Sequence, residues 1–158
     1  MRVVIDTNVL IAANGGDGGP SPECVAECAR RLLESQSQHV ILEDNADLVF
    51  KEYKNHLSFS GQPGAGDRFF EWFVRTRWTP QYVCRIDIGS NEAQVTAGIP
   101  SSCHSFDRSD HKWIAITLQG DGDLIYNALD SDYSISAITL QSEGVSVLEL
   151  CPTDLKIR

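Results

Sequence analysis

Positive charge is scarce in this sequence of 158 residues. Thirteen Lys and Arg stand against 22 Asp and Glu, which gives a formal net charge of -9. Such a charge repels phosphate backbones, so it argues against a protein that binds nucleic acid non-specifically through a basic face. A phosphate-bearing ligand would therefore need cations at the binding site itself.

Long apolar runs are also lacking. Asp6 interrupts the apolar N-terminal stretch, so no segment has the length of a signal peptide or a membrane span. We therefore expect a cytoplasmic protein without membrane contact. A hydrophobic content of 42% and a charged content of 22% are ordinary for a folded chain. Because no internal repeat or linker is present, we expect one domain over residues 1–158.

Two kinds of motif are absent. The five cysteines form no Cys-x-x-Cys pair, which argues against a zinc ribbon or a thioredoxin-like site, and reduced, mostly buried thiols are the better interpretation. Cys24 and Cys28 are one helical turn apart, and such pairs on an apolar face are more often core than metal ligands. Neither Gly-x-Gly-x-x-Gly nor a phosphate-loop lysine motif occurs, so a nucleotide-binding α/β protein is unsupported.

Apolar periodicity predicts strands that alternate with helices. We expect a first strand that begins at Val3 and ends in the polar cluster Asp6-Thr7-Asn8, further strands at 39–42, 83–88, 124–129 and 145–150, and helices at 21–36, 48–57, 67–78, 110–118 and 135–140. The glycine-rich segment 14–20 is expected to be a flexible connection, and 89–106 a loop or a loop with one helical turn. This order predicts an α/β fold with a central, mainly parallel sheet flanked by helices.

Acidic residues stand where the predicted strands end or helices begin. Asp6 ends the first strand, Asp130 follows a later one, and Asp110 opens a helix. Glu52 lies at the edge of the buried face of its helix, because Val49 and the residues in phase with it point inward. In a parallel sheet, ligands bind beyond the carboxyl ends of the strands, so these acids are expected to converge there.

Four converging carboxylates would raise one another's pKa unless a cation neutralised them. All-oxygen ligands favour Mg²⁺ or Mn²⁺ over zinc. The alternative is that the acids only cap helices and turns, and spacing alone favours neither interpretation.

Other polar and aromatic side chains near these elements have a binding and a structural interpretation. The aromatic helix at 67–78 could stack bases, but its spacing favours a core or dimer helix whose arginines cover the rim. Lys51, Lys54 and Lys112 flank the acids and are more often solvated partners of acids than phosphate ligands. His104 and His111 are left out of the site because metal-assisted hydrolysis does not require them.

Several segments resemble the motifs of PIN domains in order along the chain. Val4-Ile-Asp-Thr-Asn-Val-Leu-Ile11 resembles the opening motif, and Glu52-Tyr-x-x-x-Leu57 the second acidic helix. Asp110-His-Lys-Trp-Ile-Ala-Ile-Thr-Leu118 is similar to the third motif, Leu129-Asp-Ser-Asp-Tyr133 to the fourth, and residues 145–155 to the closing strand and proline turn. Within this superfamily, the chain looks most like the toxin components of bacterial toxin–antitoxin pairs.

The resemblance implies a metal-dependent endoribonuclease that hydrolyses phosphodiester bonds of single-stranded RNA, with one or two Mg²⁺ or Mn²⁺ ions and an antitoxin protein as partner. A homodimer is a further expectation. The implied metal ligands and catalytic residues are Asp6, Glu52, Asp110 and Asp130, with Asp132 as an auxiliary ligand and Asn8 orienting Asp6.

The fourth motif departs from the family pattern. Asn127-Ala128-Leu129 stands where a Thr or Ser is usual, so the hydroxyl is missing unless Ser131 supplies it, and the amide of Asn127 could hold a water or a phosphate oxygen. Ala128 favours an alternative function, a catalytically inactive PIN-like interaction module. A DNA-directed flap or repair nuclease is a third alternative, which the net charge disfavours.

Overall fold

The fold is built on one parallel sheet. A computed structural model describes residues 1–16 and 19–155 of the chain. In these residues the sheet has five strands in the order β3-β2-β1-β4-β5, and every neighbouring pair is parallel. The strands are β1 (Arg2–Ile5), β2 (Val40–Asp44), β3 (Val83–Ile86), β4 (Leu124–Asn127) and β5 (Val147–Glu149). The predicted α/β class is confirmed.

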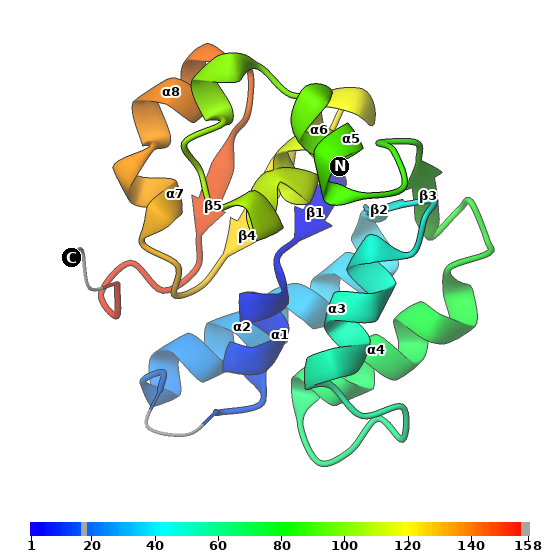
Figure 1. Cartoon of the computed structure of the whole chain (residues 1–158). Helices are drawn as coiled ribbons and strands as arrows, with labels where there is room; N and C mark the ends of the chain where they lie inside the picture. The colour runs from blue at the N-terminus through cyan, green and yellow to red at the C-terminus, as the bar shows by residue number, and fades with distance from the viewer. Residues whose placement is uncertain (17–18, 156–158) are drawn as a thin grey trace.

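Helices connect the strands and cover the sheet (Figure 1). They are α1 (Thr7–Ala13), α2 (Pro22–Gln38), α3 (Leu48–His56), α4 (Ala65–Thr76), α5 (Glu92–Ala97), α6 (His111–Gln119), α7 (Asp132–Ile135) and α8 (Ala137–Ser142), with short 3-10 turns η1 (Ser101–Cys103) and η2 (Arg108–Asp110). Helices α1, α2 and α4 pack against one another, whereas α6 packs on β1, β2 and β4.

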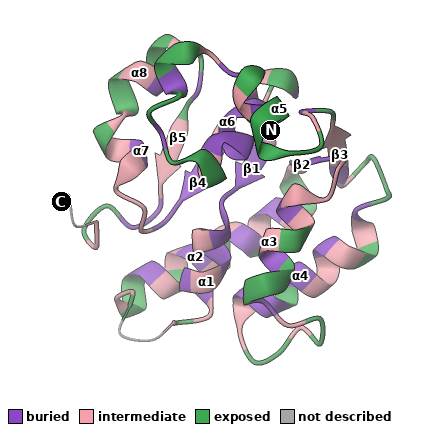
Figure 2. Ribbon diagram, viewed as in Figure 1, coloured by how far each residue is buried: buried purple, intermediate pink, exposed green. Residues whose placement is uncertain are grey.

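The central strands form the centre of the core. Figure 2 shows β1 and β4 mostly in the colour of buried residues, and Val3, Val4 and Ile5 are fully buried. A strand that is covered on both faces needs such a continuous apolar run, which is why β1 does not alternate between apolar and polar residues.

The strand order reverses direction between β1 and β4. From β1 the chain adds β2 and β3 on one side, then crosses over to place β4 and β5 on the other side. Ile5 pairs with Tyr126 in register, so the carboxyl ends of β1 and β4 lie side by side. In open α/β sheets this reversal leaves a crevice at the carboxyl ends, which is the usual place for a ligand.

The first predicted strand ends at the polar cluster as expected, but the helix that follows it was not predicted. The structure ends β1 at Ile5, and Thr7–Ala13 form helix α1 with Asp6 as its N-cap. The Asp6 carboxylate accepts a hydrogen bond from the backbone N–H of Asn8 at 3.1 Å, which satisfies one of the free amides at the start of the helix. A short apolar run such as Val9–Ile11 does not by itself distinguish a buried strand from a buried helix.

Two further segments differ from the predictions. The segment at 89–106 contains α5, which Asn91 caps by accepting a hydrogen bond from the backbone of Gln94 at 2.9 Å, so it holds more than one helical turn. The single helix predicted at 135–140 is two short helices, α7 and α8, separated at Ser136. The predicted flexible connection at 14–20 lies partly outside the described residues, which exclude 17–18.

The aromatic helix, α4, packs into the core as the spacing favours. Phe69, Phe70 and Phe73 are fully buried. Arg77, which follows the helix, was expected on an exposed rim but is itself buried, with Nη2 2.5 Å from an oxygen of Glu43 and 2.5 Å from one of Asp47. The buried charge of Glu43 explains why this arginine turns inward.

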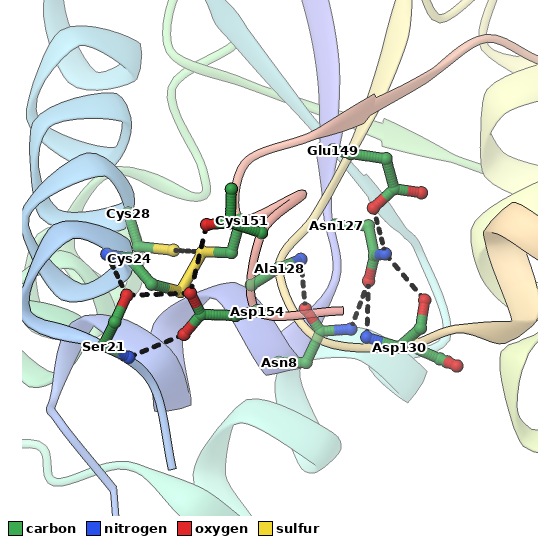
Figure 3. Close-up of a disulfide and its surroundings, with 11 residues drawn as sticks. Asn8, Ser21, Cys24, Cys28, Asn127, Ala128, Asp130, Glu149, Cys151 and Asp154 are labelled. Carbon is green, nitrogen blue, oxygen red and sulfur yellow. Dashed lines mark hydrogen bonds between the residues drawn. A yellow bond between two sulfur atoms is a disulfide. The ribbon is translucent and has the colours of Figure 1, made fainter. Parts of the chain in front are cut away.

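The prediction of reduced cysteines is wrong for one pair. Cys24 on α2 and Cys151 after β5 form a buried disulfide, with Cα atoms 5.1 Å apart (Figure 3). The two residues are 127 positions apart, and spacing does not reveal a pairing over that distance. Cys28 is a buried thiol whose Sγ lies 3.7 Å from that of Cys151.

The location of the protein stays a prediction. Disulfides are uncommon in cytosolic proteins, so the bond does not favour the cytoplasmic expectation. Within residues 1–16 and 19–155, no helix combines the length and the apolar character that a membrane span requires.

Candidate metal centre

Three of the predicted acids come together at the carboxyl end of the sheet. Asp6 follows β1, Asp110 ends η2 at the start of α6, and Asp130 follows β4. One carboxylate oxygen of each lies within 4.8 Å of one oxygen of each of the others. The elements that deliver them are 104 and 20 residues apart in sequence, and the sheet reversal between β1 and β4 is what brings them together.

Asp6 is the most deeply buried member of the cluster, with 5% of its surface exposed. Its Oδ2 accepts a hydrogen bond from the hydroxyl of Tyr133 at 2.6 Å, and its Oδ1 caps α1. Burial, together with the charges of Glu52 and Asp130, raises the pKa of Asp6 from 3.8 to about 6, although both hydrogen bonds favour the ionised carboxylate.

The pKa of Asp110 is raised more strongly than that of Asp6. Burial, followed by the charges of Asp6 and Asp130, raises the pKa of Asp110 to about 7, and Lys112 opposes the shift. Burial also raises the pKa of Asp130, against a hydrogen bond from the backbone N–H of Asp132 at 2.9 Å. Without a cation, the three carboxylates cannot all be ionised at neutral pH except at a cost in folding free energy.

This donor set fits a hard divalent cation. Carboxylate oxygens within 4.8 Å of one another are close enough for one ion to contact all three. The group contains no sulfur and no imidazole, which favours Mg²⁺ or Mn²⁺ over softer metals. Such an ion would also remove the mutual repulsion that raises the pKa of Asp6 and Asp110.

Glu52 lies beside this group and is not part of it. One oxygen accepts a hydrogen bond from the hydroxyl of Thr7, and the other is 2.9 Å from Nζ of Lys112. Lys112 is buried and its Nζ also donates to the backbone oxygen of Ser109, so the prediction of a solvated lysine is wrong here. Lys112 and Thr7 each use one acceptor site of the Glu52 carboxylate, so Glu52 would contact a metal only through the remaining sites of these oxygens.

Asn127 is a structural residue rather than a holder of water or phosphate. It is fully buried at the end of β4, and its Nδ2 donates to the backbone oxygen of Asp130 at 2.8 Å and to Glu149 at 2.6 Å (Figure 3). Its Oδ1 accepts from Nδ2 of Asn8 at 2.8 Å and from the backbone of Asp130 at 3.3 Å. An amide has two donor hydrogens and two acceptor positions, and all four are used.

Asn8 contributes to the same network. In addition to its bond to Asn127, its Oδ1 accepts a hydrogen bond from the backbone N–H of Ala128 at 2.8 Å. It therefore ties the start of α1 to the end of β4 and sets the position of Asp6 relative to Asp130. The expectation that Asn8 orients Asp6 agrees with this arrangement, through its backbone N–H and through its side chain.

The remaining predicted residues lie near the cluster without joining it. Asp132 is the first residue of α7, and its described contact to the cluster is the backbone bond to Asp130. Ser131 caps α7 without a side-chain hydrogen bond to the helix. The fourth motif usually carries a Thr or Ser hydroxyl. Among the described residues, no contact shows Ser131 supplying that hydroxyl here.

His111 is fully engaged in the fold. Its Nε2 lies 2.8 Å from the backbone oxygen of Phe106, so it carries a hydrogen there, and Nδ1 lies 2.8 Å from the hydroxyl of Thr96. A ring with both nitrogens in such bonds is held in place and has no free position for proton transfer. This agrees with leaving the histidine out of the site.

Sequence reasoning missed two residues that support the cluster. Tyr133 ends the segment that resembles the fourth motif, but its contact to Asp6 lies across the fold, and Glu149, which accepts a hydrogen bond from Asn127, carries no recognisable signal in the sequence.

No model of a known protein family matches the chain, and no curated protein or solved structure gives a significant match. The PIN-domain resemblance therefore rests on the motifs alone.

Proposed function

We propose that the protein is a PIN-like, metal-dependent endoribonuclease that cleaves single-stranded RNA. The observation that carries the proposal is the convergence of Asp6, Asp110 and Asp130 at the point where the strand order reverses. Mutually repelling acids that are buried or half-buried destabilise a fold unless a cation or shared protons offset the repulsion, and a bound cation is the arrangement that supports the proposal.

Some residues of such a site would hold the metal, and others position those ligands. Asp6, Asp110 and Asp130 would hold Mg²⁺ or Mn²⁺, which supplies Lewis-acid activation of water and neutralises the charge that develops on the phosphodiester. Tyr133 fixes one oxygen of Asp6, and Asn127 fixes the backbone of Asp130 from both sides. These contacts keep the carboxylates in place before the ligand arrives.

The test is cleavage of a long, unstructured RNA. Wild type and the double variant Asp6→Asn/Asp110→Asn are each incubated with Mn²⁺, with Mg²⁺ or with EDTA. We expect the wild type to cut only with metal and to leave 5′-phosphate and 3′-hydroxyl ends, and we expect the double variant not to cut. Cutting in EDTA, or equal cutting by the variant, would refute the proposal. A duplex DNA with a flap, treated in parallel, tests the DNA-directed alternative.

A second candidate is an inactive PIN-like interaction module. It is favoured by Ala128 in the fourth motif and by the ion pair that occupies Glu52. Absence of cleavage, together with a rise in thermal stability on addition of Mn²⁺ that the double variant lacks, would support this candidate.

A toxin role for the nuclease further requires an antitoxin. We propose that a small partner protein encoded beside this one inhibits the cleavage.

A further inference from the structure

A pocket of about 240 Å³ lies beside the acidic cluster, between α3, α5 and the turn η2 with the start of α6. Its lining includes Glu52 and Lys112, the ion pair that borders the cluster. Arg108 also lines it and belongs to the same three-residue turn as Asp110. A ligand in this pocket would therefore lie next to the carboxylates.

The pocket brings together three cations, which outnumber the two carboxylates of its lining in a protein of net charge -9. The cations are Lys51, Arg108 and Lys112, and the carboxylates are Glu52 and Glu92. Among the described residues, Lys51 makes no ion pair, and Arg108 pairs only with Glu92 at 3.8 Å, where both side chains are more than half exposed. Exposed pairs of this kind contribute little free energy, so a stronger anion readily replaces the partner. Lys51 and Arg108 are thus available to a phosphate.

Other arginines of the protein are committed elsewhere. Arg30 and Arg75 lie 2.8 Å and 2.6 Å from glutamates on their own helices, and Arg77 is buried against Glu43. Lys54 and Arg68 are exposed and make no ion pair among the described residues, but neither lines this pocket. The pocket differs from those positions in placing cations with weak or no partners next to the acidic cluster.

The rest of the lining suits the sugar and base of a nucleotide. Leu48 and Val95 supply apolar surface, while Asn55 and Ser109 supply an amide and a hydroxyl. The amide of Asn55 can donate to and accept from a ribose 2′-hydroxyl, and the Ser109 hydroxyl, which donates to Asp107 at 2.9 Å, can accept from it. The 2′-hydroxyl is the group that distinguishes RNA from DNA. The pocket volume of about 240 Å³ lies below the roughly 300 Å³ at which typical small-molecule sites begin, so the pocket holds no ligand larger than one nucleotide.

We propose that this pocket binds one ribonucleotide of a single-stranded RNA, next to the phosphodiester that reaches the acidic cluster. Lys51 and Arg108 contact its phosphate, and Asn55 with Ser109 faces the sugar. The role of this pocket in cleavage rests on the proposed nuclease function. The binding of RNA to the pocket can be measured without cleavage.

The experiment measures binding of a fluorescently labelled single-stranded RNA to protein carrying Asp6→Asn, which blocks cutting, by anisotropy at 50 and 200 mM salt. The pocket variant adds Lys51→Gln/Arg108→Gln, and the matched control adds Arg30→Gln/Arg75→Gln, which removes the same charge from α2 and α4. A third variant, Asn55→Trp, narrows the pocket without changing charge. Thermal unfolding of each protein establishes that it is folded.

We expect the pocket variant to bind about ten-fold more weakly at 50 mM salt, and its salt dependence to be less steep by about 1.4 in log affinity per log salt, since two phosphate contacts are lost. The control should change by less than about two-fold. Asn55→Trp should weaken binding of RNA, and DNA of the same sequence should bind more weakly than RNA to the parent protein.

The outcomes separate the two proposals. Equal losses in the pocket variant and the control, or no binding of single-stranded RNA to the parent, would overturn the pocket assignment, even if the wild type cleaves RNA. If the wild type cuts no RNA, binding by the Asp6→Asn protein that depends on Lys51 and Arg108 would support the pocket and refute the nuclease. Equal affinity for DNA and RNA would overturn the assignment of the sugar contacts.

Discussion

Neutralising Asp110 should stabilise the metal-free protein. Burial and two neighbouring carboxylates raise its pKa from 3.8 to about 7. A tenfold change in proton affinity corresponds to about 1.4 kcal/mol. Because the side chain is partly exposed, we reduce the cost that ionised Asp110 imposes on the unfolding free energy to about 2 kcal/mol. Among the described contacts its carboxylate accepts no hydrogen bond and caps no helix amide, so Asp110→Asn removes charge without removing a bond.

The sign of this effect depends on pH. Because the folded-state pKa lies above the unfolded value, the ionised form is the costly one, and the cost is fully present above about pH 7. It is lost as pH falls from about 7 to about 4, where the unfolded chain also takes up a proton. The stabilisation by Asp110→Asn should therefore be largest at pH 8.5 and nearly absent at pH 4.

Urea denaturation in EDTA at pH 8.5 and pH 4 measures the difference, and the thermal midpoint at pH 8.5 should rise by about 5 °C. Asp107→Asn is the control, because Asp107 is exposed and its pKa is lowered by hydrogen bonds from Ser109, so its neutralisation should not stabilise. A less stable Asp110→Asn protein at pH 8.5 would refute the electrostatic explanation.

Three other features of the fold can be tested by denaturation. Reducing the Cys24–Cys151 disulfide should lower the unfolding free energy by about 5 kcal/mol, because the bond closes a loop of well over one hundred residues; an unchanged urea midpoint in a dithiol reductant would contradict this. Asn127→Ala removes four buried hydrogen bonds and should cost about 3 kcal/mol by urea denaturation, whereas a cost below about 1 kcal/mol would show that the network is not needed. Tyr133→Phe should raise the pKa of Asp6 and cost about 2 kcal/mol at pH 8, with a smaller cost below pH 6, and a cost independent of pH would argue against the bond to the ionised carboxylate.

The fold class followed from the sequence because local patterns determine it. Apolar runs at 39–42 and 124–129 mark buried strands, and the intervening helices carry clear caps, such as Ser21, which accepts a hydrogen bond from Cys24. Helix α1 did not follow, since the apolar residues after Asp6 satisfy a buried strand and a buried helix equally well. The N-cap that begins this helix is the single carboxylate of Asp6.

The acids of the candidate site could be predicted, but their supports could not. Asp6, Asp110 and Asp130 occupy positions that a parallel sheet brings to one edge, so the sequence order was enough to expect their convergence. Glu52 was expected with them, but it forms an ion pair with Lys112. This pair depends on the contact of α6 with α3, where the rings of Tyr53 and Trp113 stack. The roles of Tyr133 and Glu149 depend on contacts across the fold that no local pattern records.

Binding of Mn²⁺ at pH 8 shows most directly whether the three aspartates form a divalent metal site. Calorimetric titration of the wild type should show one or two bound ions, and Asp6→Asn/Asp110→Asn should lose this binding. The double variant Asp107→Asn/Asp121→Asn, which removes the same charge elsewhere, should bind as the wild type does. Absence of binding to the wild type, or equal binding to both double variants, would contradict the proposed metal site.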